Sequence, residues 1–133
     1  MLKQIAVYLE NKKGKAAECC KIIKDQDINI EAMSIADTQD FGILRLITSN
    51  NEKALAALKA NNFIANIVEL VGVEIPNQPG ALAILLKELD EDNINIEYLY
   101  SFANDNGQAQ IGFKTDDIEK AAALLKSRGV KTI

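Results

Sequence analysis

Asparagine and glycine occur together in two short turns whose chemistry suits a small charged molecule. Asn11 lies three residues before Gly14, and Asn77 lies three residues before Gly80. The sequence after each glycine has helical periodicity, so each turn precedes the N-terminus of a predicted helix. The first N–H groups of a helix are unpaired and carry partial positive charge, which suits a carboxylate. Glycine lets the backbone approach such a ligand closely, and asparagine both donates and accepts hydrogen bonds.

A second pair of asparagines, Asn29 and Asn95, lies at the start of a predicted strand in each half of the chain. A free α-amino acid needs donors for its carboxylate and acceptors for its ammonium group. A helix N-terminus, side-chain amides and nearby carbonyls supply both, whereas the alternative for the turn asparagines is that asparagine is simply a common turn residue. The candidate ligand-binding residues are Asn11, Lys12, Gly14, Asn29, Asn77, Gln78, Gly80, Ala81 and Asn95.

No catalytic constellation accompanies these residues. The sequence has no histidine, which removes the commonest general base and metal ligand. Cys19 and Cys20 are adjacent, a poor geometry for a disulfide with each other, and their place in a helical stripe favours a role as small core residues. Glu31 and Glu97 are equivalent single carboxylates rather than a catalytic pair. A phosphate-binding glycine motif is also missing, so we expect no enzyme, no cofactor and no metal.

The composition of the chain excludes several further classes of protein. The 133 residues are 48% apolar and 26% charged, close to the averages for soluble globular proteins. A net charge of −4 makes nucleic acid an unfavourable partner. No apolar run approaches the roughly 18 residues of a membrane span, and the N-terminal "MLKQIAVYLENKKG" does not resemble a signal peptide. These features predict a cytoplasmic protein that binds neither nucleic acid nor a membrane.

The elements that position these residues occur twice. "INIE" stands at residues 28–31 and again at 94–97, and the same offset aligns "IAVYLENKKGKAAECCKIIKDQDINIE" with "VGVEIPNQPGALAILLKELDEDNINIE". Further on, "NEKALAALKANNF" aligns with "IEKAAALLKSRGV". Because the matches are spread along both segments, the chain is a duplication of a unit of roughly 65 residues. We predict a first domain at residues 1–69 and a second at 70–133.

Each unit has the pattern strand, helix, strand, strand, helix, strand. Apolar residues alternate in 3–9, as in a half-buried strand. A hairpin is predicted around "TQD" in the first copy and around "NDNG" in the second. The second helices begin near Asn51 and Asp116, which suit helix N-caps. The helical stripes of the two first helices are Ala16, Cys19, Cys20 and Ile23, and Leu82, Leu85, Leu86 and Leu89.

This pattern predicts an α+β fold of two ferredoxin-like βαββαβ units, each a four-stranded antiparallel sheet with two helices on one face. Paired side by side, the units would form an eight-stranded antiparallel sheet. The strand at 41–47 has apolar residues on both faces, which we interpret as a sign of homodimerisation. Tyr98, Tyr100 and Phe102 form an aromatic row that either packs or forms an apolar pocket wall.

These residues resemble the opening half of an ACT domain, the amino-acid-sensing module of biosynthetic enzymes. The family pattern is roughly Asn-x-Pro-Gly, a leucine-rich helix, and then Gly-hydrophobic-Asn-hydrophobic. The second copy matches it at Asn77, Pro79, Gly80, Ile94, Asn95 and Ile96. The first copy matches it at Asn11, Gly14, Ile28, Asn29 and Ile30.

The resemblance covers nearly the whole chain, as two tandem ACT units without a catalytic domain. It implies a regulatory protein that binds a free amino acid at the interface between paired units and acts on a metabolic enzyme partner. Serine-sensing members carry a histidine where this chain has Leu9 and Ile75, which argues against serine. Lys13 replaces the family proline, so the first copy binds differently, through lysine, or not at all. The alternative is a structural subunit that uses the ACT pair for oligomerisation, with no ligand.

Overall fold

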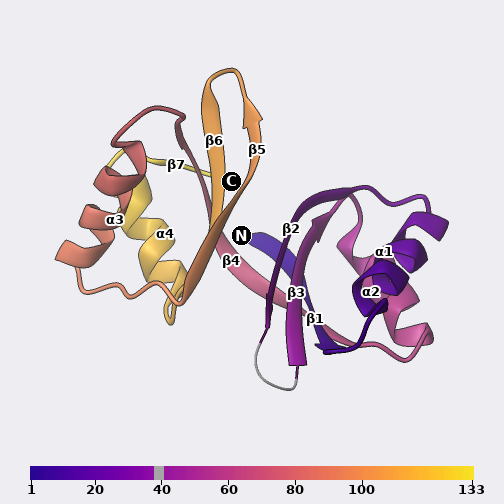
Figure 1. Cartoon of the computed structure of the whole chain (residues 1–133). Helices are drawn as coiled ribbons and strands as arrows, with labels where there is room; N and C mark the ends of the chain where they lie inside the picture. Colours follow the sequence, from indigo (N-terminus) through magenta and orange to yellow (C-terminus); the bar gives the residue numbers. More distant parts are fainter. Residues whose placement is uncertain (38–40) are drawn as a thin grey trace. The chain divides into compact units, whose positions relative to one another are not determined.

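The structure is a computed structural model that describes residues 1–37 and 41–133, so the predicted "TQD" turn lies outside the described residues. Figure 1 shows the helices and strands along the chain. Their bounds are β1 (Leu2–Glu10), α1 (Lys15–Asp25), β2 (Ile30–Asp37), β3 (Phe41–Thr48), α2 (Asn51–Ala60), β4 (Ile64–Pro76), α3 (Ala81–Glu91), β5 (Tyr98–Asp105), β6 (Gln108–Lys114), α4 (Ile118–Ser127) and β7 (Lys131–Thr132).

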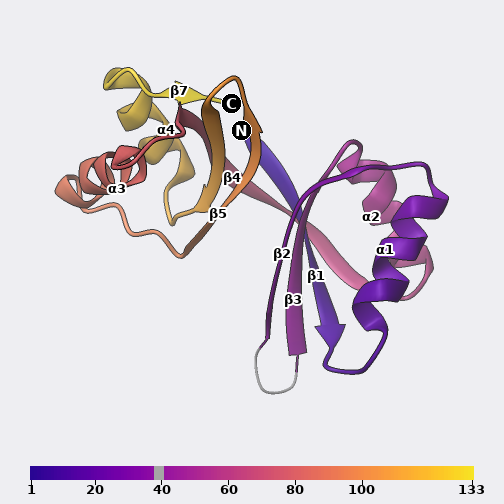
Figure 2. The ribbon, with the colours of Figure 1, turned by 45° about the horizontal axis from the view of Figure 1, so that its top comes forward.

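The chain divides into two compact units, Lys3–Val68 and Glu69–Ile133 together with Met1–Leu2. Strand order is β2-β3-β1-β4 in the first unit and β5-β6-β4-β7 in the second. Both orders are those of a ferredoxin-like unit. Helices α1 and α2 cover one face of the first sheet, and α3 and α4 cover one face of the second (Figures 1 and 2).

The described residues form seven strands rather than the eight that two separate units would have. β4 is one strand of 13 residues that serves both units. Its Val71–Pro76 part pairs with β6, and the strand also pairs with β1. The stretch is mostly apolar, and the last strand of one unit continues into the first strand of the next. An eight-stranded sheet is therefore not present in the described part of the chain.

The core of the first unit lies between its sheet and its two helices. Ile5 and Val7 of β1 are fully buried and lie opposite Leu46 and Leu44 of β3. Cys19 and Ile23 supply the buried positions of α1. Burial raises the pKa of the Cys19 thiol to about 12, with smaller contributions from the neighbouring Cys20 and Glu18. This thiol is therefore a protonated core group rather than a nucleophile.

The second unit needs glycine on the face of its sheet that carries no helix. Gly72 and Gly112 lie opposite each other on β4 and β6. A Cβ atom on Gly112 would lie 3.0 Å from Leu2 Cδ2 and 3.2 Å from Leu70 Cδ1. Phe102 of the predicted aromatic row also lies here, with its ring 3.8 Å from that Cβ position. The glycines therefore make room for apolar side chains that cover this face.

Two helix caps differ from the prediction by one residue. Asn50, not Asn51, caps α2 by accepting a hydrogen bond from the N–H of Lys53. Asp117, not Asp116, caps α4 by accepting from the N–H of Lys120. In each copy two adjacent residues both suit an N-cap, so the sequence alone does not distinguish them.

The second hairpin turns at Asn106 and Gly107, and β5 continues as far as Asp105. Both turn residues have positive φ, which is typical of a two-residue hairpin with an Asn-Gly turn. In the described part of the chain, no helix has the length and apolar character that crossing a membrane requires.

Candidate functional site

The two predicted binding turns have the same backbone conformation. The N–H of Ala81 donates to the carbonyl of Gln78, and the N–H of Lys15 donates to the carbonyl of Lys12. The glycines have φ/ψ of 87°/−5° in the first turn and 88°/−14° in the second. These values belong to the third residue of a type II turn, a position that requires glycine. The reason for glycine is therefore the positive φ, because a Cβ atom on either residue would meet nothing within 4 Å.

Each turn leads directly into a helix N-terminus. The first bond of the helical ladder runs from the N–H of Ile84 to the carbonyl of Gly80 in α3, at 3.0 Å. The N–H groups of Leu82 and Ala83 precede that bond and point out of the helix end. The first turn of α1 contains Glu18, whereas the first turn of α3 contains no acidic residue. The N-terminus of α3 is therefore the more favourable of the two for a carboxylate.

Charges at the first turn are already paired with each other. Lys12 Nζ lies 2.9 Å from Glu10 Oε2, and Lys15 Nζ lies 3.6 Å from Glu18 Oε2. The hydrogen bond between Lys12 and Glu10, and then their charge attraction, lower the pKa of the Glu10 carboxyl and raise the pKa of Lys12. A ligand at this turn would have to compete with these exposed pairs.

A hollow adjoins each turn. In the first unit a hollow of about 280 Å³ is lined by Leu9, Glu10, Asn11, Lys12, Lys15, Ala16, Ile35 and Gly42. In the second unit a hollow of about 160 Å³ is lined by Ile75, Pro76, Gln78, Ala81, Ile84, Leu85, Glu88 and Val130. The structure thus brings Asn11 and Lys12 together with the start of α1, and Gln78 and Ala81 together with the start of α3. Asn77 and Gly80 are exposed on the turn itself.

The strand asparagine of the first unit lies far from the turn. The end of β1 pairs with Phe41 and the start of β2 pairs with Thr48, at opposite ends of β3. Asn11 follows β1 and Asn29 precedes β2, so these two residues lie at opposite ends of the sheet. The eight residues of β3 span about 23 Å at the rise of an extended strand. One small ligand cannot contact both asparagines of this unit.

The second unit repeats this arrangement. The end of β4 pairs with Gln108, whereas the start of β5 pairs with Lys114 at the other end of β6. Asn77 follows β4 and Asn95 precedes β5, so about 20 Å of strand separates them. The nine candidate residues therefore form a turn group and a strand group in each unit, and the structure does not bring the two groups of one unit together.

Hydroxyl residues hold the strand asparagines, from neighbouring rather than equivalent positions of the repeat, since Thr115 aligns with Thr48. The backbone N–H of Asn29 donates to Ser49 Oγ at 3.0 Å, and its carbonyl accepts from the N–H of Ser49. The carbonyl of Asn95 accepts from Thr115 Oγ1 at 2.7 Å. Both asparagines are exposed, so their backbones are fixed while their side chains face solvent.

Sequence analysis missed several residues that line the hollows, Ile35, Gly42, Glu88 and Val130. These come from strands and helix positions distant from the turns, and only the strand order brings them there. Across residues 1–37 and 41–133, no group of three or more His, Cys, Asp or Glu side chains is arranged to hold a metal ion.

The family model that describes an ACT domain pair matches residues 1–132. The chain belongs to the ACT domain pair family. This match confirms the resemblance found in the sequence, and the two units are tandem ACT units. No curated protein matches the sequence significantly.

Among solved structures, this ACT pair is similar to protein BT0572 from Bacteroides thetaiotaomicron. The two are 42% identical with a TM-score of 0.92, over 99% of this chain and 91% of the other. The regulatory subunit of aspartate kinase from Thermus thermophilus, in its ligand-free form, is 16% identical with a TM-score of 0.67, over 94% and 91%. The same subunit from Thermus flavus is 16% identical with a TM-score of 0.63, over 94% and 90%. The two kinase subunits share the fold of this chain.

Proposed function

We propose that this ACT pair is a regulatory module, without catalytic activity of its own, that binds a free amino acid. The observation that carries the proposal is the type II turn that opens into the N-terminus of α3 with no acidic residue in its first turn. The free N–H groups would bind the ligand carboxylate. Asn77 on the turn would supply an amide that accepts from the ammonium group or donates to the carboxylate.

We propose further that the complete site is assembled between two copies of the chain. β2 and β5 are the edge strands of their units, each with a neighbour on one side only in the described sheet. β2 has an apolar border formed by Met33 and Ile35, which are 47% and 55% exposed to solvent. An edge strand of this kind is a template for pairing with another chain. Pairing across a two-fold axis would make a homodimer in which one unit from each copy joins into an eight-stranded sheet.

This pairing would bring the turn group and the strand group together. A two-fold axis makes the paired edge strands antiparallel, so the start of one lies beside the end of the other. The strand asparagine lies at the start of the edge strand. The turn lies at the other end of the sheet, where β2 ends. In a pair of β2 strands Asn29 of one chain would approach the first turn of the other, and in a pair of β5 strands Asn95 would approach the second turn. Either pairing would overcome the separation of about 20 to 23 Å within one unit.

The module would regulate a separate metabolic enzyme. Chains of the same fold include the regulatory subunit of aspartate kinase from Thermus thermophilus. A ligand can act in this way only if it binds one assembly of module and enzyme better than another. We therefore propose that the bound amino acid changes the association of this chain with its enzyme partner.

A thermal-shift screen of the purified protein against the twenty amino acids tests the proposal. A ligand that binds only the native state raises the melting temperature, so one amino acid or a small related group is expected to do so. Asn77→Ala and Asn95→Ala should each abolish the shift while the unliganded melting temperature changes little, because both side chains are exposed. If no amino acid stabilises the protein, the chain is a structural subunit and the proposal is wrong.

A further inference from the structure

The tip of the β5–β6 hairpin carries the one Asn-Gly step of the sequence, at Asn106 and Gly107. Both residues are exposed, and their φ angles of 50° and 75° belong to the tight two-residue turn described above. The first copy has "TQD" at the aligned residues 38–40. The Asn-Gly step is therefore specific to the second copy, the one whose turn is the more favourable for a carboxylate.

This hairpin tip is hydrogen-bonded to the binding turn. The backbone N–H of Asn77 donates to the carbonyl of Gly107 at 2.8 Å. The preceding residue, Pro76, lies opposite Gln108 at the end of the β4–β6 ladder. Asn77 begins the turn that leads into α3, so the carbonyl of Gly107 helps to fix where this turn starts. A covalent change at the tip would therefore be transmitted to the candidate binding turn.

An asparagine that precedes a glycine is able to lose its side-chain amide by an intramolecular reaction. The backbone nitrogen of Gly107 attacks Cγ of Asn106 and forms a bond to it, and the side-chain nitrogen leaves as ammonia with the proton of the attacking N–H. Water then opens the five-membered succinimide at one of its two carbonyls, which gives aspartate or isoaspartate. Glycine favours the attack because it has no Cβ atom to shield its nitrogen.

We propose that Asn106 is a deamidation site whose modification alters the binding turn at Asn77. The last paired residues of the hairpin are Asp105 and Gln108, so the reacting nitrogen lies outside the ladder and local opening of the exposed tip is enough for the attack. Isoaspartate carries the main chain through its side chain and lengthens the tip by one atom, which displaces the carbonyl of Gly107 from its donor. Both products also add a negative charge beside the turn. If the turn binds a carboxylate, as the proposed function states, this charge weakens the binding.

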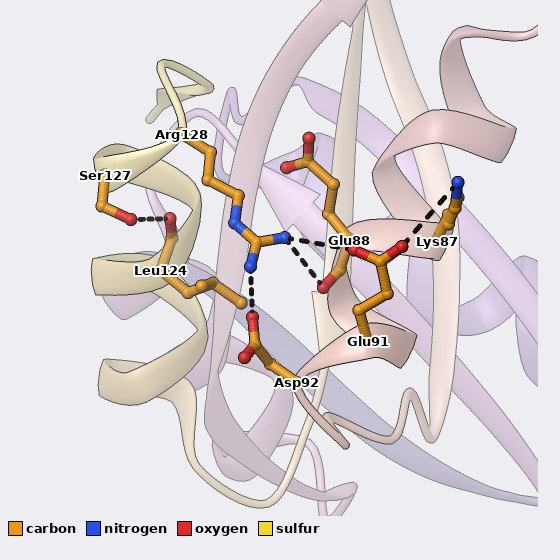
Figure 3. A network of polar contacts seen from close by, with 7 residues as sticks. All are labelled: Lys87, Glu88, Glu91, Asp92, Leu124, Ser127 and Arg128. Atoms are coloured by element: carbon orange, nitrogen blue, oxygen red, sulfur yellow. Dashed lines mark hydrogen bonds and ion pairs between the residues drawn. The ribbon is translucent and has the colours of Figure 1, made fainter.

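Two other asparagines with positive φ serve as internal controls. Asn62 has a φ of 68° and Asn93 a φ of 56°, and both are exposed. The backbone nitrogen after each one donates to a helix carbonyl, at 3.0 Å for Phe63 and 2.9 Å for Ile94, and belongs to a residue with a bulky side chain. The end of α3 beside Asn93 is further held by the guanidinium group of Arg128 (Figure 3). These sites share the left-handed backbone of the hairpin tip but not its accessible nitrogen.

The first experiment follows the purified full chain during incubation at 37 °C and pH 8 by peptide mass spectrometry. Each amide converted to a carboxylate adds about 1 Da. Conversion at Asn106 should be at least ten times faster than at Asn62 and Asn93. Asn106→Gln should abolish it over the same period, because the longer side chain would have to close a six-membered ring. Similar rates at the three asparagines would overturn the proposal.

The second experiment compares fresh and incubated ¹⁵N-labelled protein by NMR. The amide resonance of Asn77 should shift as the modified form accumulates, and it should stay in place in incubated Asn106→Gln. An unchanged Asn77 resonance in the fully modified protein would overturn the link to the turn. Neither experiment needs an amino acid, so both outcomes are independent of the proposed function. With the amino acid from the thermal-shift screen, modified protein should show a smaller shift than fresh protein; equal shifts would contradict the effect on binding, whereas no shift in fresh protein would contradict the proposed function instead.

Discussion

At the scale of single residues, Gly80 has a backbone conformation that other residues adopt only with strain. Its φ of 88° lies in the left-handed region, which costs an L-residue about 1–2 kcal/mol. Gly80→Ala should therefore lower the free energy of unfolding by about 1–2 kcal/mol in urea denaturation. Gly42→Ala is the matched control, since Gly42 has no positive φ and its nearest atoms would lie 3.9 Å from the new Cβ. Equal losses in both variants would contradict the turn assignment.

Cys19 gives a pH dependence whose sign follows from its burial. Its pKa is raised to about 12 in the folded state, from the ordinary thiol value of 9.0. The unfolded chain therefore loses this proton first, so the stabilisation is complete below pH 9 and is lost as the pH rises towards 12. Cys19→Val should remove this part of the decline in the unfolding free energy. Chemical denaturation of the unmodified protein and of Cys19→Val at pH 8, 9 and 10 measures this difference, because the two proteins share all other titrating groups. If the unfolding free energies of the two proteins change with pH in parallel, Cys19 has no such effect.

Residue roles at the turns could be predicted from the sequence only in part. The position of each glycine in front of a helix could be predicted, because Asn-x-x-Gly is followed by helical periodicity in both copies. Their physical reason, a positive φ in a type II turn, needs the backbone angles. The burial of Glu88 Oε2 could not be predicted, since a glutamate on an amphipathic helix is ordinarily exposed, whereas in the structure this oxygen is buried without a hydrogen-bond partner among the described residues.

At the scale of elements, the cap of α4 decides where that helix begins. Asp117 accepts from the N–H of Lys120, whereas the neighbouring Asp116 is exposed outside the helix. Asp117→Ala should lower the free energy of unfolding by about 1 kcal/mol. Asp116→Ala should change it by less than about half of that, as for an ordinary surface residue. Chemical denaturation of the two variants compares them, and the reverse ranking would place the cap at Asp116.

The elements themselves were predicted well because their periodicities are strong. β3 occupies the predicted residues 41–48, since apolar residues run through a segment with turn residues on both sides. The boundary between the last strand of one unit and the first strand of the next was not predictable in the same way. Residues 63–75 are long enough for two strands, and whether they bend or continue depends on pairing with β1 and β6.

At the scale of the whole molecule, the border of β2 should control assembly. Ile35 is 55% exposed on this edge strand. Ile35→Lys should convert the proposed dimer into monomers in sedimentation velocity, because a charge on an edge strand opposes pairing. Ile84→Lys, a matched change at an exposed isoleucine of α3, should leave the dimer intact. A dimer that persists in Ile35→Lys would place the interface elsewhere.

The grouping of the candidate site residues is what the sequence could not supply. Asparagines at the turn and at the strand start are equivalent in the two copies, and the resemblance to ACT domains implied a site at the interface between paired units. Strand register separates them by about 23 Å in the first unit and about 20 Å in the second, because the first helix of each unit returns the chain to the opposite end of the sheet. The sequence therefore gave the candidate residues, whereas their separation within one unit, on which the proposal of a site between two chains rests, needs the strand register.

The most direct test of the account is complementation between two inactive variants, measured by calorimetry with the amino acid that gives the largest thermal shift. Asn77→Ala and Asn95→Ala chains should each fail to bind it. If the site combines the turn of one chain with the strand asparagine of another, mixed dimers of the two variants contain one intact site, and the mixture should bind with the affinity of the unmodified protein. A mixture as inactive as its components would contradict a site shared between chains.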